Sequence, residues 1–224
     1  MIKAVVLDLD DTACLTEAVC YEMENEVLGQ MGRGPMSREV HLKTWGKPLF
    51  EAILERSPGV DVEAFKNVYH PIITEYTQTG KLDAIPGENY KAMDELISMG
   101  KLLLVLTSRT HTELKHLLES DHLLAKRVEA FYYRDNTAYH KPDPRAFDEL
   151  LATHGLEPSE CVYIGDSVGD AQSAKGAGLH FIASLESGLR QESDFEGLAV
   201  DLFVPRFIDI PMAVRELDSS TPTR

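Results

Sequence analysis

Polar residues that could do chemistry stand at four places in this sequence, each directly after an apolar run or at the predicted start of a helix. The most acidic cluster is DLDDT at residues 8–12, in which three carboxylates stand within four positions. Carboxylates this close repel one another and cost stability unless a proton or a cation relieves them. The other clusters are TS at 107–108, HKPDP at 140–144 and GDSVGD at 165–170. Each cluster alone also fits a solvated turn or a helix start, but here all four occur in one chain.

Together these residue types could transfer a phosphoryl group through a covalent aspartate. One carboxylate can attack phosphorus and so split a difficult displacement into two steps. A second acid can protonate the leaving oxygen and later take a proton from water. Carboxylates can hold a divalent cation beside the phosphoryl oxygens, while a lysine and a hydroxyl bind the oxygens that remain.

Apolar runs along the chain predict the strands that position these clusters. Short β-branched or leucine-rich runs at 2–9, 102–107, 130–133, 161–164 and 180–183 are typical of buried parallel strands, with an edge strand at 202–204. Helical patterns separate them, including a capping box of Thr110 and Glu113 ahead of Leu114, Leu117 and Leu118. The fold class predicted is therefore α/β, a Rossmann-like doubly wound parallel sheet whose ligand crevice lies at the carboxyl ends of the strands.

One long interruption divides this pattern. Between residues 15 and 84 only helical stripes occur, such as the apolar residues at 19, 23 and 27 and those between 65 and 76. We expect a helical subdomain at 15–84, inserted into a core made of 1–14 and 85–212. The polar C-terminal end predicts a frayed tail at 213–224.

The four motifs resemble those of the haloacid dehalogenase superfamily, a group of aspartate-nucleophile phosphatases and phosphotransferases. DLDDT is similar to its first motif, LLLVLT at 102–107 to its second, HKPDP to its third and GDSVGD to its fourth. The helical insertion matches the α-helical cap that phosphoglycolate phosphatase-like and β-phosphoglucomutase-like members carry after the first motif.

The resemblance implies a role for each matching residue. Asp8 would be the nucleophile and a metal ligand. Asp10 would act as general acid and then as base, with its backbone carbonyl on the metal. Thr107 would bind a phosphate oxygen, and Lys141 would steady the nucleophile and the transferring group. Asp166 would ligate Mg²⁺ directly, and Asp170 directly or through water.

Substrate contacts are expected at two further places. Backbone N–H groups of Leu9 and Ser108 could cradle phosphate oxygens. Arg109 could bind an anion in the crevice, or it could be a solvated charge where a helix begins. In the insertion, Lys43, Trp45 and Lys47 stand at a joint between helices and could reach the substrate, or Trp45 could only anchor the packing of that joint.

Composition limits the possible partners. The chain of 224 residues has 22 basic and 37 acidic residues, a formal net charge of −15, which argues against nucleic acid and against an anionic membrane. Its apolar runs are too short to span a bilayer, and its first residues lack the pattern of a signal peptide, so we expect a cytoplasmic protein. Three cysteines without a C-x-x-C pair suggest buried thiols, with Cys14 as a less favoured accessible one.

The expected activity is a Mg²⁺-dependent phosphatase acting on a small phosphorylated metabolite. Asp10 argues against a dehalogenase or a phosphonatase, because only a phosphate ester gains from a second acid at this position. A phosphosugar mutase or phosphotransferase with the same covalent step is the alternative, and a non-catalytic phosphometabolite-binding protein is a third. Phosphoglycolate, sugar phosphates, nucleotides and pyrophosphate all fit the pattern, and the oligomeric state is left open.

Overall fold

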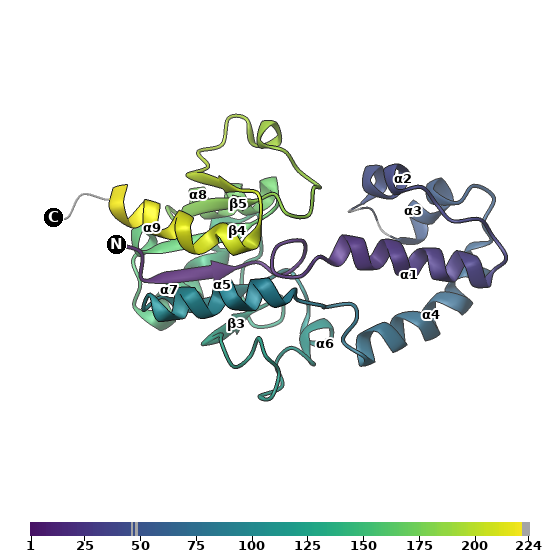
Figure 1. The fold of residues 1–224 in the computed structure, drawn as a ribbon, viewed down its shortest axis with the longest axis horizontal. Coiled ribbons are helices and arrows are strands. Elements are labelled where there is room, and N and C mark those ends of the chain that lie inside the picture. Colours follow the sequence, from purple (N-terminus) through teal and green to yellow (C-terminus); the bar gives the residue numbers. More distant parts are fainter. Residues whose placement is uncertain (46, 48, 221–224) are drawn as a thin grey trace. The chain divides into compact units, whose positions relative to one another are not determined.

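The structure, a computed structural model, describes residues 1–45, 47 and 49–220. The chain divides into two compact units, drawn in Figure 1. We call the first the sheet unit; it holds Met1–Cys14 and Ile85–Arg224. We call the second the helical unit; it holds Leu15–Ala84. The chain therefore leaves the sheet unit directly after the first acidic motif and returns 70 residues later.

The sheet unit is built on six parallel strands in the order β3-β2-β1-β4-β5-β6, which confirms the predicted fold class. The first strand lies centrally, between the second and the fourth. The strand order reverses between β1 and β4: β2 and β3 lie on one side of β1, and β4 to β6 lie on the other. Ligands of such folds bind at the carboxyl ends of the strands beside this switch point. The strands are β1 (Ala4–Leu7), β2 (Leu102–Leu106), β3 (Ala130–Tyr132), β4 (Cys161–Gly165), β5 (His180–Ser184) and β6 (Leu202–Val204).

Alternate side chains of each strand pack into two separate cores, because successive residues of a strand point to opposite faces. Val5 and Leu7 face the core under α5 (Gly87–Ser98) and α9 (Ile210–Ser220). Ala4 and Val6 face the core under α7 (Asp148–His154) and α8 (Val168–Gly176). Burial on both faces explains why the strands read as continuous apolar runs. The remaining elements of this unit are α6 (His111–Leu114) and the 3₁₀ helices η1 (Pro144–Phe147), η2 (Pro158–Glu160), η3 (Glu192–Phe195) and η4 (Phe207–Asp209).

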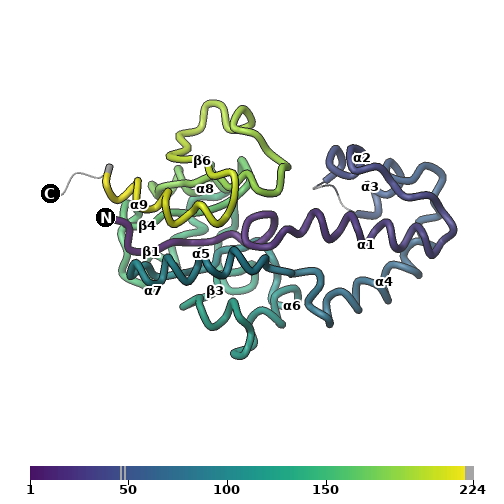
Figure 2. Tube along the Cα trace, in the orientation of Figure 1, coloured from purple at the N-terminus to yellow at the C-terminus, as the bar shows by residue number. Residues whose placement is uncertain are grey.

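The C-terminal segment differs from the expected frayed tail. Within the predicted tail at 213–224, residues 213–220 form most of α9, and Val214 and Leu217 are buried in the core. A polar clasp ties this helix to the start of the chain, and Figure 2 shows the two lying together. Asp218 Oδ1 accepts the Ile2 N–H at 2.6 Å, while Lys101 Nζ donates to Asp218 Oδ2 at 2.5 Å and to the Ile2 carbonyl at 2.7 Å. The prediction of a frayed segment was wrong for the described part, and residues 221–224 lie outside it.

The helix expected after β2 is shorter than its apolar pattern suggests. Thr110 and Glu113 form the predicted capping box, but α6 ends at Leu114 and turns follow it. Leu114 and Leu117 are nevertheless fully buried in the core under α5. The apolar spacing thus identified core residues correctly and overestimated the length of the helix.

The helical unit has four helices among its described residues: α1 (Thr16–Gln30), α2 (Arg38–Thr44), α3 (Leu49–Arg56) and α4 (Val62–Gln78). Its core contains Met23, Val27, Ile53 and Phe65. Side-chain caps begin two of the helices: Ser37 accepts the Val40 N–H, and Asp61 accepts those of Glu63 and Ala64.

Buried polar contacts join three helices of this unit. Arg56 Nη1 donates to both carboxylate oxygens of Glu24, at 2.6 and 2.7 Å. His41 Nδ1 lies 2.5 Å from Glu17 Oε1, and its ring lies 5.3 Å from that of Trp45. Arg56 Nε donates to the Thr44 hydroxyl at 2.7 Å, so the end of α2 is held by polar contacts on several sides.

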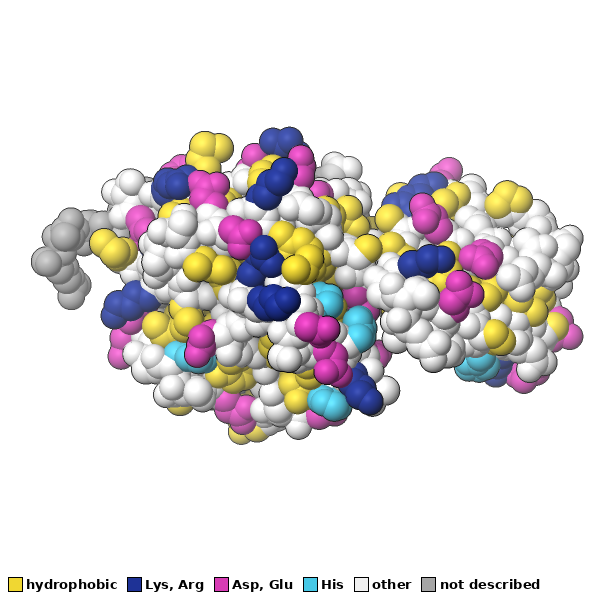
Figure 3. All heavy atoms as spheres, turned by 60° about the horizontal axis from the view of Figure 1, so that its bottom comes forward, with side chains coloured by type: hydrophobic (Ala, Val, Ile, Leu, Met, Phe, Trp, Pro, Cys, Tyr) yellow, Lys and Arg dark blue, Asp and Glu magenta, His cyan; other side chains and the backbone are white. Residues whose placement is uncertain are grey.

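The surface carries charges of both signs. On the face drawn in Figure 3, basic side chains are interspersed with acidic and apolar ones. Across residues 1–45, 47 and 49–220, no helix has both the length and the apolar composition needed to cross a membrane.

Candidate active site

Asp8 sits directly after β1, in the middle of the sheet. Its backbone N–H donates to the Ile164 carbonyl at 2.9 Å, which continues the ladder between β1 and β4 by one residue. The Leu9 N–H donates to Asp8 Oδ1 at 2.8 Å. The first acidic motif is therefore fixed by the strand pairing, and the buried Asp8 carboxylate is oriented by the backbone that follows it.

A tight loop carries the rest of this motif. The N–H groups of Thr12 and Cys14 both donate to the Leu9 carbonyl, and Asn89 Nδ2 donates to the Ala13 carbonyl at 3.1 Å. Asp11 has a φ of 55°, the only positive value for a non-glycine residue in the described chain. Such a conformation disfavours residues with a side chain, so the surrounding contacts must hold it. Cys14 is fully buried, and the alternative of an accessible thiol was wrong.

The fourth motif brings two more carboxylates to the same edge. Asp166 directly follows β4, and Asp170 lies in the first turn of α8, whose capping box it forms with Ser167. Asp170 Oδ2 accepts the Ser167 hydroxyl at 2.6 Å and the Ser167 N–H at 3.0 Å. A Cβ at Gly165 would lie 2.7 Å from the Asp170 Cβ, so glycine is required for Asp170 to approach the end of the strand.

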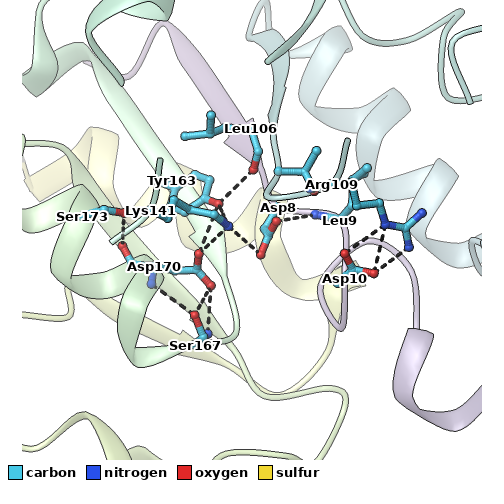
Figure 4. A network of polar contacts seen from close by, with 11 residues as sticks. Asp8, Leu9, Asp10, Leu106, Arg109, Lys141, Tyr163, Ser167, Asp170 and Ser173 are labelled. Atoms are coloured by element: carbon cyan, nitrogen blue, oxygen red, sulfur yellow. Dashed lines mark hydrogen bonds and ion pairs between the residues drawn. The ribbon is translucent and has the colours of Figure 1, made fainter. Parts of the chain in front are cut away.

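Lys141 reaches this edge from the loop before η1 and joins the carboxylates, as Figure 4 shows. Its Nζ lies 3.0 Å from Asp8 Oδ2 and 2.7 Å from Asp170 Oδ1. It also donates to the Tyr163 hydroxyl at 2.7 Å, and that hydroxyl lies 3.0 Å from the Leu106 carbonyl, to which it donates. Burial lowers the pKa of Lys141, but attraction to Asp170 and Asp8 outweighs it and raises the pKa above its ordinary value. The lysine is therefore charged and directed at Asp8.

Tyr163 is the contact that the sequence did not reveal. It lies on β4 and is fully buried in the core under α7 and α8. A buried tyrosine hydroxyl needs a polar partner. Only the fold, which brings β4, the end of β2 and the lysine loop together, shows that its partners are Lys141 and the Leu106 carbonyl.

Three carboxylates are placed where they could hold a metal ion. Asp8, Asp166 and Asp170 each offer an oxygen, and these oxygens lie within 4.8 Å of one another. Burial is the largest cause and raises the pKa of Asp8 to about 7; attraction to Lys141 opposes this rise, and repulsion from Asp170 and Asp10 adds to it. Burial likewise raises the pKa of Asp166 to about 8, and the neighbouring carboxylates add to the effect. A hard divalent cation such as Mg²⁺ prefers carboxylate oxygens and would supply the missing positive charge, so this donor set fits it.

Asp10 and Arg109 form an ion pair beside this cluster. Arg109 Nε lies 3.0 Å from Asp10 Oδ2 and 3.2 Å from Oδ1, and Nη2 lies 2.6 Å from Oδ1. Arg109 is buried, so its interpretation as a solvated charge where a helix begins was wrong. Its role in substrate binding, and that of the Asp10 carbonyl in metal binding, stay predictions.

The remaining predicted residues fall into two groups. Thr107 is buried after β2 and its hydroxyl accepts the Arg109 N–H at 3.3 Å, whereas Ser108 is exposed. The others lie in the helical unit. Trp45 follows the last residue of α2, and its ring lies against that of His41. Lys43 is exposed, and Lys47 Nζ lies 2.6 Å from Glu55 Oε1. Gly46 and Pro48 of the same joint lie outside the described residues.

Comparison with known proteins identifies a family. The family model described as haloacid dehalogenase-like hydrolase matches residues 5–184. A phosphoglycolate phosphatase of Nitrosospira multiformis is 25% identical over 223 residues, 96% of each chain, and one of Caulobacter vibrioides is 32% identical over 168 residues, 75% of this chain and 67% of that one. Among solved structures, a haloacid dehalogenase superfamily hydrolase of Geobacter sulfurreducens has a TM-score of 0.70 at 21% identity, covering 95% of this chain and 96% of its own, which shows the shared fold.

Proposed function

Since the chain belongs to the haloacid dehalogenase-like hydrolases, we propose that it is a Mg²⁺-dependent phosphatase that hydrolyses a small phosphorylated metabolite through an aspartyl-phosphate. One observation carries this proposal. The buried Asp8 carboxylate has the Lys141 ammonium 3.0 Å away and shares a 4.8 Å cluster with Asp166 and Asp170. A nucleophile, a cation and a metal-binding set therefore meet at one point of the sheet edge.

The residues of the site divide the reaction between them. Asp8 attacks phosphorus, and the bond from phosphorus to the ester oxygen breaks as Asp10 gives that oxygen a proton. Water then attacks phosphorus as Asp10 takes a proton from it. The bond from phosphorus to the Asp8 oxygen breaks, which restores the Asp8 carboxylate and releases inorganic phosphate. When bound, Mg²⁺ supplies positive charge to the phosphoryl oxygens. Lys141 orients Asp8 and adds to that charge, and the Thr107 hydroxyl binds a remaining oxygen.

Substrate selection is proposed for the helical unit, which would act as a cap. Water must be kept from a reactive site until the substrate is bound, and a closing unit does this while adding contacts to the leaving group. The last turn of α2 offers Lys43, and the residues after it offer Trp45 and Lys47, for those contacts. Since curated relatives are phosphoglycolate phosphatases, phosphoglycolate is the first compound to test.

A phosphate-release screen tests the proposal. The purified protein is incubated with phosphoglycolate, sugar phosphates, nucleotides, pyrophosphate and aryl phosphates, in Mg²⁺ and in EDTA. We expect inorganic phosphate from at least one monoester in Mg²⁺, none in EDTA, and recovery when Mg²⁺ is added back. Full turnover in EDTA would contradict the metal site. Exchange between sugar phosphate isomers without phosphate release would favour the mutase instead.

A further inference from the structure

The two partners of the ion pair between Asp10 and Arg109 differ in how deeply they are buried. The Arg109 side chain is 9% exposed, whereas that of Asp10 is 40% exposed. Arg109 is also fixed through its backbone, because its N–H donates to Thr107 Oγ1 at 3.3 Å and its carbonyl accepts the Arg134 N–H at 2.9 Å. The arginine is thus the rigid member of the pair, and the carboxylate is the member that reaches solvent.

Both carboxylate oxygens of Asp10 accept hydrogen bonds from the Arg109 guanidinium. Nη2 lies 2.6 Å from Oδ1, and Nε lies within 3.2 Å of both oxygens. Contacts of this kind fix the plane of a carboxylate as well as its position, which a lysine ammonium does not do. A half-exposed aspartate would otherwise be able to move between staggered rotamers. The pair in Figure 4 therefore selects one orientation of the Asp10 carboxylate.

We propose that Arg109 is a positioning residue that orients the acid–base carboxylate of Asp10, an inference that rests on the proposed function. Arg109 acts through Asp10 and does not bind the substrate itself. The contact leaves room for chemistry, because a carboxyl group offers four lone-pair directions and the transferred proton needs one. Misplacement of a reacting group by about 1 Å costs up to about 100-fold in rate, so a fixed carboxylate matters most where proton transfer limits the reaction.

The choice of leaving group exposes this role. Phenyl phosphate has a poor leaving group that needs the proton, whereas 4-nitrophenyl phosphate has a good one that does not. We expect Arg109→Gln to lower kcat/KM for phenyl phosphate by about 10- to 100-fold and for 4-nitrophenyl phosphate by much less. In an Asp10→Asn background, Arg109→Gln should cost less than about twofold further, because coupled residues are not additive. Arg109→Lys keeps the charge without the fork and should show the same pattern with a smaller loss, so it tests the proposal even if Arg109→Gln does not fold.

A matched control separates this role from the general loss of an arginine. Arg127 makes a two-pronged pair with Asp94 on the surface of the same unit, at 2.7 and 2.9 Å. Arg127→Gln should leave the ratio of the two kcat/KM values unchanged. Equal losses for both esters in the Arg109 variants, or an undiminished loss in the Asp10→Asn background, would overturn the inference. If the wild-type protein hydrolyses both esters, the proposed function stands whether or not the Arg109 variants behave as expected. If it hydrolyses neither ester, the result counts against both the proposed function and this inference.

Discussion

The clustered carboxylates of the candidate site have too few positive charges near them to balance their own. Lys141 is the cation that contacts both Asp8 and Asp170, yet burial and mutual repulsion still raise the pKa of Asp8 to about 7 and that of Asp166 to about 8. Neither carboxylate has this environment in the unfolded chain, where an aspartate titrates near pH 4. The stability of the metal-free protein must therefore depend on pH through these two groups.

The sign of that dependence is opposite to that of a salt-bridged aspartate. With a folded pKa above the unfolded one, the folded state holds more protons between about pH 4 and pH 8, so its stability falls as pH rises through this window. We expect the Tm in EDTA to fall from pH 5 to pH 8, and Mg²⁺ to raise it more at pH 8 than at pH 5. Asp166→Asn should flatten the slope and weaken the Mg²⁺ effect. Calorimetry checks this, and a Tm in EDTA that rises across the window in the wild type would contradict it.

Residue types and spacing were enough to predict some contacts of the site but not others. Asp8 and Asp166 each follow a strand, and parallel strands bring such residues to one edge, so their meeting could be predicted. The pairing of Arg109 with Asp10 depends on side-chain directions of two loops, and the sequence left Arg109 between two interpretations. The hydrogen bond of Lys141 to Tyr163 depends on where the loop before η1 places the lysine, which the apolar run of β4 does not encode.

At the scale of elements, α9 shows that a helix can be missed in the sequence when its last residues are polar. The sequence after residue 217 is polar, and this suggested a frayed tail. Yet Ile210, Val214 and Leu217 are spaced i, i+4, i+7 and form the face buried on the sheet. That spacing was a usable signal, whereas the clasp through Asp218 joins residues 216 apart in sequence and could come only from the structure.

The clasp predicts a local contribution to stability. Asp218→Ala removes the acceptor of the Ile2 N–H and the counter-charge of the buried Lys101, so we expect the free energy of unfolding to fall by about 1–3 kcal/mol. Arg215→Ala on the same helix removes a surface pair with Glu95 and should cost at most about 1 kcal/mol. Denaturant unfolding of both variants provides the comparison. Equal small losses would show that the clasp does not stabilise α9.

At the scale of the whole molecule, the chemical step and the selection of substrate are proposed for two different units, each with its own core. The sheet unit carries every residue proposed for the chemical step, and the helical unit carries the residues proposed for selection. The buried contacts of Glu24, Arg56 and Thr44 give the helical unit a firm end to α2, next to the joint that holds those residues. Sequence patterns predicted that this unit is helical, but a substrate's identity depends on side-chain placement that patterns do not encode.

Selection by the joint can be tested apart from catalysis. We expect the double variant Lys43→Ala and Lys47→Ala to raise KM for the preferred metabolite by about tenfold more than KM for 4-nitrophenyl phosphate, because lost charge-assisted hydrogen bonds weaken binding of the metabolite's polar part. The double variant Lys66→Ala and Lys81→Ala removes the same charge from α4 and the residues after it, and should change neither KM. Equal shifts in both lysine pairs would assign the effect to net charge alone.

The most direct test of the account follows the phosphoryl group itself. Wild-type protein is mixed with its substrate and Mg²⁺, quenched in acid during turnover and examined by peptide mass spectrometry, beside an Asp8→Asn variant whose Tm is measured in parallel. The account predicts one phosphoryl group on the peptide containing Asp8 in the wild type, and neither phosphorylation nor turnover in the folded variant. Retained turnover in Asp8→Asn, or a phosphoryl group on another residue, would contradict it.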